Sequence, residues 1–148
     1  MSGAFFGSRV DRLEPYGPIG FSLNDCIRYA EASGDRNPIH IDRETARAEG
    51  FEDCVVHGML IAGQFEGAIR HWYGNIWLAE SATQFVRPLP VDRVVIISGN
   101  VIRATPQNSE VMLRLVVRDA DREVICYADT RVSLGRSKAE EQYLRDAE

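Results

Sequence analysis

This sequence of 148 residues lacks the features that define several classes of protein. Its three cysteines, Cys26, Cys54 and Cys126, are too few and too far apart for a disulfide framework, so we expect reduced thiols in a cytoplasmic protein. Positive charge is in deficit, with 17 Lys and Arg against 22 Asp and Glu, which argues against a nucleic-acid partner. No apolar run approaches membrane-spanning length and the N-terminus has no signal-peptide pattern, so we expect no membrane association.

The remaining composition, 45% hydrophobic and 26% charged, is that of an ordinary globular chain long enough to bury a core. The length fits a single domain, and residues 1–148 contain no linker or internal repeat. Residues 1–20 have no clear period, and we expect an extension along the surface with a short strand near residues 9–13. Residues 136–148 are charged, and we expect a frayed helix or a disordered tail.

Helical signals fill the next part of the chain. Ser22 is a predicted N-cap, and the helix that follows is expected to end near Ser33, where Gly34 can adopt a left-handed conformation. Asp42 is a predicted cap for a second short helix over residues 43–49.

A longer helix is predicted from Gly58 to Trp72, and it is apolar on most sides, as expected for a buried helix. The pattern then alternates with a period of two, which indicates strands. Four strands are predicted, over residues 76–86, 93–104, 110–119 and 123–134. We therefore expect an α+β fold in which a curved antiparallel sheet wraps around the long helix. An open sheet edge would be covered by a second copy of the chain.

Asp35 and His40 form the first candidate site. They lie in a turn that Gly34, Asn37 and Pro38 constrain, because proline keeps the preceding residue out of the helical region. A carboxylate and an imidazole held together can move protons at neutral pH. The alternative is that Asp35 only caps the turn and His40 is a packed surface histidine.

His57 and Gly58 form the second candidate site, at the start of the long helix. Backbone N–H groups there are unpaired and can polarise an oxygen that becomes negative, and glycine allows close approach. The alternative is a helix-terminal histidine followed by a packing glycine.

Other chemistries are weaker. His40, Asp42 and His57 offer metal ligands, but their spacing matches no common zinc signature, so we expect no metal. Ser33 and Cys54 are possible nucleophiles, but neither lies in a strand–turn–helix elbow.

The segment from residue 29 to 40, YAEASGDRNPIH, and the later VHGM at residues 56–59 closely resemble the MaoC-like (R)-specific enoyl-CoA hydratases and dehydratases. The resemblance extends loosely over residues 20–134, and FVRPL at residues 85–89 is similar to the family's Phe-x-x-Pro-Val stretch. It departs at Val91-Asp92, where the family often has Gly-Asp, and at Gly63, where the (R)-hydratases often have serine.

This resemblance implies a single hotdog domain and a homodimer, or a pseudo-dimer with a sister subunit. The implied reaction is reversible addition of water across a 2-enoyl thioester to give the (R)-3-hydroxyacyl thioester. Asp35 and His40 would activate the water, and the N–H of Gly58 would polarise the thioester carbonyl. The implied substrate-binding residues are Asn37, Pro38, His57 and Met59. No metal or redox cofactor is needed, since coenzyme A or the phosphopantetheine of acyl carrier protein enters only as part of the substrate.

Two other functions use the same fold. A hotdog thioesterase would direct water at the thioester carbonyl, and the complete Asp35/His40 loop argues against it. A non-catalytic partner subunit would usually have lost Asp35 or His40, and this chain keeps both. The sequence does not determine the acyl group of the substrate. Three aromatic residues could line a wide pocket, but we expect them in the core: Trp72, Tyr73 and Trp77.

Overall fold

The computed structural model describes residues 12–135. Five antiparallel strands form one sheet in the order β1-β3-β4-β5-β2. Their bounds are Tyr16–Gly20 (β1), Ile76–Phe85 (β2), Val94–Thr105 (β3), Glu110–Asp119 (β4) and Val124–Leu134 (β5). The four long strands agree with the predicted ranges to within one residue at each end. The expected tail at residues 136–148 and most of the expected strand at residues 9–13 lie outside the described residues.

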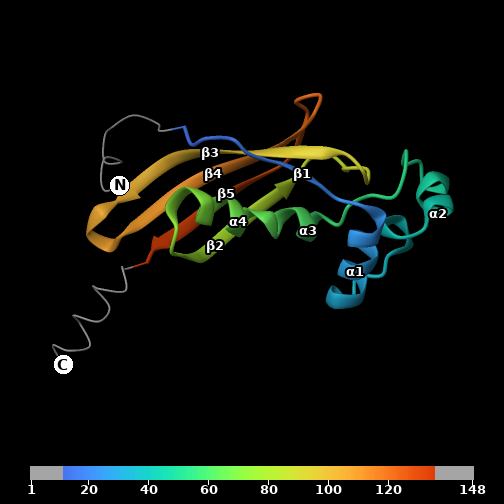
Figure 1. Cartoon of the computed structure of the whole chain (residues 1–148), viewed down its shortest axis with the longest axis horizontal. Coiled ribbons are helices and arrows are strands. Elements are labelled where there is room, and N and C mark those ends of the chain that lie inside the picture. Colours follow the sequence, from blue (N-terminus) through green and yellow to red (C-terminus); the bar gives the residue numbers. More distant parts are fainter. Residues whose placement is uncertain (1–11, 136–148) are drawn as a thin grey trace.

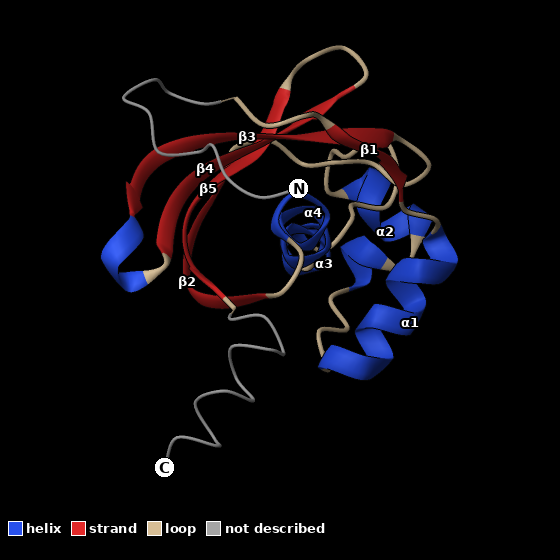
Figure 2. Ribbon diagram, turned by 60° about the vertical axis from the view of Figure 1, so that its left-hand side comes forward, coloured by secondary structure: helices blue, strands red, loops and turns tan. Residues whose placement is uncertain are grey.

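The helices lie in two groups. Helices α3 (Gly58–Ala62) and α4 (Gln64–Tyr73) follow each other inside the curve of the sheet (Figures 1 and 2). Helices α1 (Leu23–Ser33) and α2 (Arg43–Ala48) lie beside its open side, with two short 3-10 turns, η1 (Pro38–His40) and η2 (Pro106–Asn108), in the loops. None of the helices that the structure describes is long and apolar enough to span a membrane.

The core lies between α4 and the concave face of the sheet. Phe65, Ala68 and Ile69 of α4 are buried, and they belong to one cluster with Leu113 and Leu115 of β4. A helix that is apolar on most sides needs such enclosure, because burial of its apolar surface stabilises the fold by roughly 25 cal/mol per Å². The expected curved sheet around a buried helix is therefore confirmed.

Two elements differ from the sequence prediction. The strand β1 was not expected, because Gly17 and Pro18 indicate a loop; its strand character comes from pairing with the edge of β3, where Ile19 lies opposite Val95. The predicted long helix is divided at Gly63, which keeps helical dihedrals (φ −59°, ψ −19°) and donates its N–H to the Met59 carbonyl at 2.9 Å. The axis of the two helices is thus nearly continuous (Figure 1).

The three aromatic residues expected in the core have different positions. Trp72 and Tyr73 pack partly buried against the core. Trp77, on the edge strand β2, is 73% exposed, so its expected place in the core was wrong. Side chains alternate across a strand, and Ile76 is the neighbour of Trp77 that faces inward, with 4% exposure.

Candidate active site

The loop between α1 and α2 is held by local hydrogen bonds. Gly34 ends α1 in the left-handed region (φ 82°), as its position predicted. The Asp35 carboxylate accepts from the N–H of Asn37 at 3.3 Å, and the Asn37 side chain accepts from the N–H of Ile39 at 3.3 Å. Asn37 thereby caps the 3-10 turn that Pro38 begins. The turn residues therefore fix where the carboxylate points.

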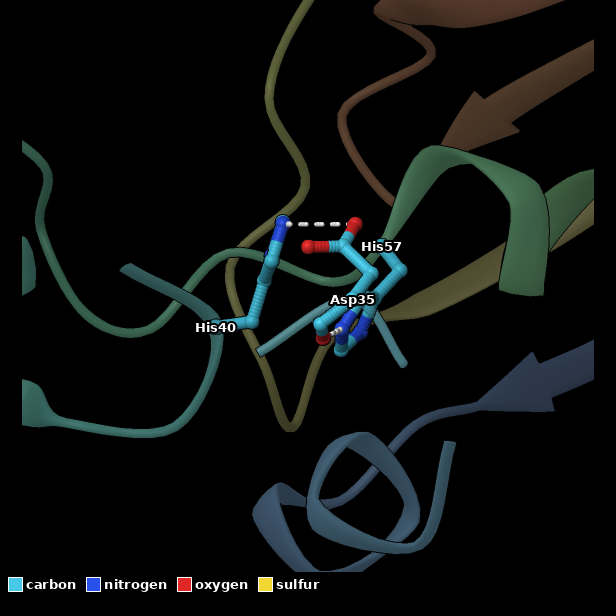
Figure 3. Close-up of side chains that lie close together, drawn as sticks. All are labelled: Asp35, His40 and His57. Atoms are coloured by element: carbon cyan, nitrogen blue, oxygen red, sulfur yellow. Dashed lines mark hydrogen bonds and ion pairs between the residues drawn. The ribbon is translucent and has the colours of Figure 1, made fainter. Parts of the chain in front are cut away.

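His40 faces Asp35 across the loop. Its Nδ1 lies 2.6 Å from the Val55 carbonyl, and because a carbonyl oxygen only accepts, Nδ1 carries the hydrogen. In the neutral ring the lone pair is then on Nε2, which lies 3.8 Å from Oδ2 of Asp35 (Figure 3). That separation is too long for a direct hydrogen bond, and an oxygen atom about 2.8 Å from both atoms would fit between them.

These two side chains lie on the wall of a cavity of about 520 Å³. Most of the wall is apolar. The lining residues include Tyr29, Val56, Met59, Ile61, Phe85 and Leu89. A volume of this size and an apolar wall with few polar groups are typical of small-molecule sites. The Asp35 carboxylate and the His40 imidazole are thus presented to a space suited to an apolar ligand.

Gly58 also lines this cavity, at the first position of α3. A Cβ on Gly58 would lie 2.8 Å from Cε1 of Phe85 and 2.9 Å from Cζ, so only glycine allows the ring to pack there. No hydrogen bond from the N–H of Gly58 to another described residue is seen. Gly58 therefore gives the Phe85 ring room at the cavity wall, and its N–H has no partner among the described residues.

His57 occupies a different place from the one expected. Its side chain is 1% exposed and lies behind the wall, stacked on the His40 ring with centroids 3.8 Å apart and planes 21° apart. Its Nε2 donates to the backbone carbonyl of Asp35 at 3.0 Å (Figure 3). Burial lowers the pKa of His57, and the neighbouring His40 acts in the same direction, against the hydrogen bond to Asp35. His57 therefore contacts both other site residues.

Of the residues expected to bind substrate, only Met59 lies on the wall of the large cavity; Asn37, Pro38 and His57 lie outside it. Sequence reasoning missed Tyr29, which lines the cavity from α1, and the Val55 carbonyl that fixes the His40 ring. Tyr29 stands within the YAEASGDRNPIH segment, which was the available signal. Nothing local marks a carbonyl fifteen residues away as a partner.

The alternative nucleophiles are occupied or buried. The Ser33 hydroxyl donates to the Tyr29 carbonyl at 2.7 Å and accepts from the N–H of Asp35. Cys54 is fully buried, and this burial raises its pKa and keeps the thiol protonated.

Asp35, His40 and His57 could each offer a ligand atom to a metal, with these atoms within 4.8 Å of one another. Asp42, the acid considered from the sequence, instead caps α2 by accepting from the N–H of Glu44. Lone pairs of imidazole nitrogens lie in the ring planes, so two stacked rings do not direct them at one point.

A curved antiparallel sheet around a central helix is the hotdog fold. Residues 12–117 match the family model described as "MaoC like domain", and the chain belongs to this family.

Named relatives and a solved structure are also similar. The chain is 45% identical over 62 residues to the mitochondrial 3-hydroxyacyl-[acyl-carrier-protein] dehydratase of Arabidopsis thaliana. The matched stretch covers 41% of this chain and 37% of that protein. It is 36% identical over 64 residues to the (R)-specific enoyl-CoA hydratase of Aeromonas caviae, and this match covers 41% of this chain and 48% of that protein. The chain thus matches less than half the length of these two relatives. The solved (R)-hydratase from A. caviae superposes with a TM-score of 0.80 at 21% identity, covering 89% of this chain and 100% of that one.

Proposed function

We propose that this protein catalyses the reversible hydration of a trans-2-enoyl thioester to the (R)-3-hydroxyacyl thioester. The observation that carries the proposal is the pair formed by the Asp35 carboxylate and His40 Nε2, 3.8 Å apart on the wall of an apolar cavity. Relatives named as an (R)-specific enoyl-CoA hydratase and as an acyl-carrier-protein dehydratase support the assignment.

A water between the two groups would be held by both. His40 accepts the proton of this water at Nε2, because its Nδ1 hydrogen is committed to the Val55 carbonyl. The water oxygen bonds to C3 of the enoyl group, and the pair returns a proton to C2, so that one H₂O is added across the double bond.

Negative charge then develops on the thioester oxygen. The N–H of Gly58 is the proposed donor to this oxygen, since Gly58 lines the same cavity and its N–H bonds to no other described residue. The acyl chain would lie against the apolar wall near Met59 and Phe85, which are 62% and 48% exposed without a ligand.

We propose that no metal or redox cofactor takes part. Stacked rings that do not converge on one point, and the use of His57 Nε2 by the Asp35 carbonyl, support this view. Coenzyme A or acyl carrier protein would enter only as carrier of the substrate. The buried free thiols Cys26, Cys54 and Cys126 support a reducing compartment such as the cytoplasm.

A homodimer is also proposed. Among the described residues no strand pairs with the outer side of β2, and Trp77 on this strand is exposed. An open edge of ten residues is a template for pairing with another strand. Light scattering is expected to give twice the mass of the chain, with partial dissociation of Trp77→Lys. A monomeric wild type would contradict this.

The test follows the enoyl absorbance of crotonyl-CoA with purified protein, then determines the configuration of the product. Wild type is expected to remove the band and give the (R)-3-hydroxy product. Asp35→Asn and His40→Ala are expected to stay folded and lose roughly 100- to 10,000-fold in kcat, the usual contribution of general acid–base groups. Asp121→Asn and His71→Ala change the same side-chain types at exposed positions, and are expected to keep full activity.

Wild-type turnover in folded Asp35→Asn or His40→Ala would contradict the mechanism. No loss of the enoyl band with crotonyl, longer-chain and cyclic enoyl thioesters would contradict the hydratase assignment. Release of free thiol from a saturated acyl-CoA by the same preparation would support the thioesterase instead.

A further inference from the structure

His57 is a buried titratable residue that the proposed hydration does not use. It is 1% exposed and lies outside the lining of the cavity, so it does not meet the substrate. A histidine has a polar ring that is costly to bury without hydrogen bonds, and an apolar residue of the same size would fill the space more simply. Its contacts point to a role in the arrangement of the site.

The first contact is with the main chain of Asp35. His57 Nε2 lies 3.0 Å from the Asp35 carbonyl, although the two residues are 22 positions apart. The carbonyl accepts, so the hydrogen is on Nε2. This bond joins the start of α3 to Asp35, the residue that carries the proposed catalytic carboxylate, and it holds the main chain of Asp35 against the start of the helix.

The second contact is with the ring of His40. The two rings stack with centroids 3.8 Å apart, while the edge-on ring of Tyr29 lies 4.7 Å from His57. His40 is therefore held from two directions: by the Val55 carbonyl at Nδ1 and by the face of His57. Both members of the Asp35–His40 pair rest on one buried ring (Figure 3).

The third observation concerns the charge of His57. Its Nδ1 is buried and has no hydrogen-bond partner within the part of the chain described here. The rings of Tyr29 and His40 contact the His57 ring, and the Asp35 carbonyl accepts from its Nε2. The Cys26 thiol lies against the main chain of His57. A proton on Nδ1 would lack an acceptor and would add a positive charge against His40 whenever His40 is protonated. The neutral ring is the form that fits.

We propose that His57 is a positioning residue that stays neutral and sets the separation of Asp35 from His40. This inference rests on the proposed hydratase function. It assigns to His57 no contact with substrate.

Two substitutions separate this role from simple filling of space. His57→Gln keeps an N–H donor near the Nε2 position and loses the ring, whereas His57→Phe keeps a ring and loses the donor. If positioning through the Asp35 carbonyl matters, Phe loses roughly 100-fold in kcat with little change in KM, as for a misplaced catalytic group, and Gln recovers part of it. If His57 only fills space, the order reverses: Phe keeps wild-type kcat and Gln is the weaker variant.

His71→Phe is the matched control, since His71 is exposed and also contacts a tyrosine ring, Tyr16. Thermal unfolding of each variant checks that it is folded at the assay temperature. Wild-type kcat and an unchanged pH–rate profile in folded His57→Phe would overturn the inference.

A readout independent of activity uses the ¹⁵N shifts of the imidazole rings. Wild-type His57 is expected to show a protonated Nε2 and a bare Nδ1 throughout pH 5.5–8 at a ligand-free site. Conversion of His57 to the imidazolium within that range would overturn the inference even in an active hydratase. Inactive wild type with a neutral His57 would instead count against the proposed function alone.

Discussion

Replacing Gly58 by alanine puts a methyl group where the ring of Phe85 already lies. The added Cβ would be 2.8 Å from Cε1, 2.9 Å from Cζ and 3.1 Å from Cδ1 of that ring, well inside the usual carbon–carbon contact of about 3.5 Å. Overpacking of this kind costs roughly 1–3 kcal/mol. Alanine is otherwise favoured over glycine by up to about 1 kcal/mol in a helix. Phe85 is 48% exposed, so its ring can turn aside at part of this cost, and the expected net loss in the free energy of unfolding is about 1 kcal/mol.

Urea unfolding at pH 7 measures this loss, and a second background isolates its cause. In Phe85→Leu the shorter side chain leaves the methyl group room, so Gly58→Ala is expected to be neutral or slightly stabilising there. The coupling energy between positions 58 and 85 is then expected to equal about the whole energetic cost of the contact between the added methyl group and the Phe85 ring. An equal destabilisation by Gly58→Ala in both backgrounds would refute the contact with Phe85 as its source.

Two further predictions concern a helix cap and the thiols. Ser22→Ala removes the acceptor for the N–H of Asp25, a bond of 3.1 Å, and is expected to cost about 1 kcal/mol in urea unfolding at pH 7. Hydrogen bonds from the Ser22 backbone and side chain hold the pKa of Asp25 below its ordinary value, so its stabilisation is present above the unfolded pKa and lost as pH falls through the folded one. The deficit of the variant is therefore expected to shrink toward pH 3, and a deficit that grows would contradict the cap. Burial raises the pKa of Cys26 and Cys126 to about 11 and also raises the pKa of Cys54. A thiol reagent at pH 8 is therefore expected to react slowly with the folded protein and promptly with all three thiols in urea. Prompt reaction of the folded chain would contradict the burial of the thiols.

The parts of the fold that sequence predicted well depend on neighbours in the chain. Ser22 and Gly34 cap α1 through hydrogen bonds within one turn: the Ser22 side chain accepts from the N–H of Asp25, and the N–H of Gly34 donates to the Ala30 carbonyl. The same holds for the loop of Asp35 and His40, whose turn residues bring the two side chains together. The proximity of the two side chains was therefore predictable from local chemistry.

The parts that sequence missed depend on distant partners. The segment of β1 reads as a loop at Gly17 and Pro18, and becomes a strand only because β3 offers an edge. His57 was expected at the substrate, yet packing of α1 and the His40 loop over the start of α3 buries it. No local sequence pattern predicts which side chains at the start of a helix will line a cavity, because tertiary packing decides this.

The short segment of residues 54–56 is joined by main-chain hydrogen bonds to the loop of His40 and to the segment of residues 89–91. The Val55 N–H donates to the Ile39 carbonyl at 3.0 Å, the Val56 N–H donates to the Leu89 carbonyl at 2.8 Å, and the Cys54 carbonyl accepts from Val91 at 2.9 Å. Main-chain bonds survive most exchanges of side chain. The surface proposed to face the acyl chain is thus open to change by mutation, natural or designed, while Asp35 and His40, the proposed proton-transfer groups, keep their positions. Such a division between a tunable pocket and a fixed reaction centre lets one scaffold be adapted to new acyl groups a residue at a time.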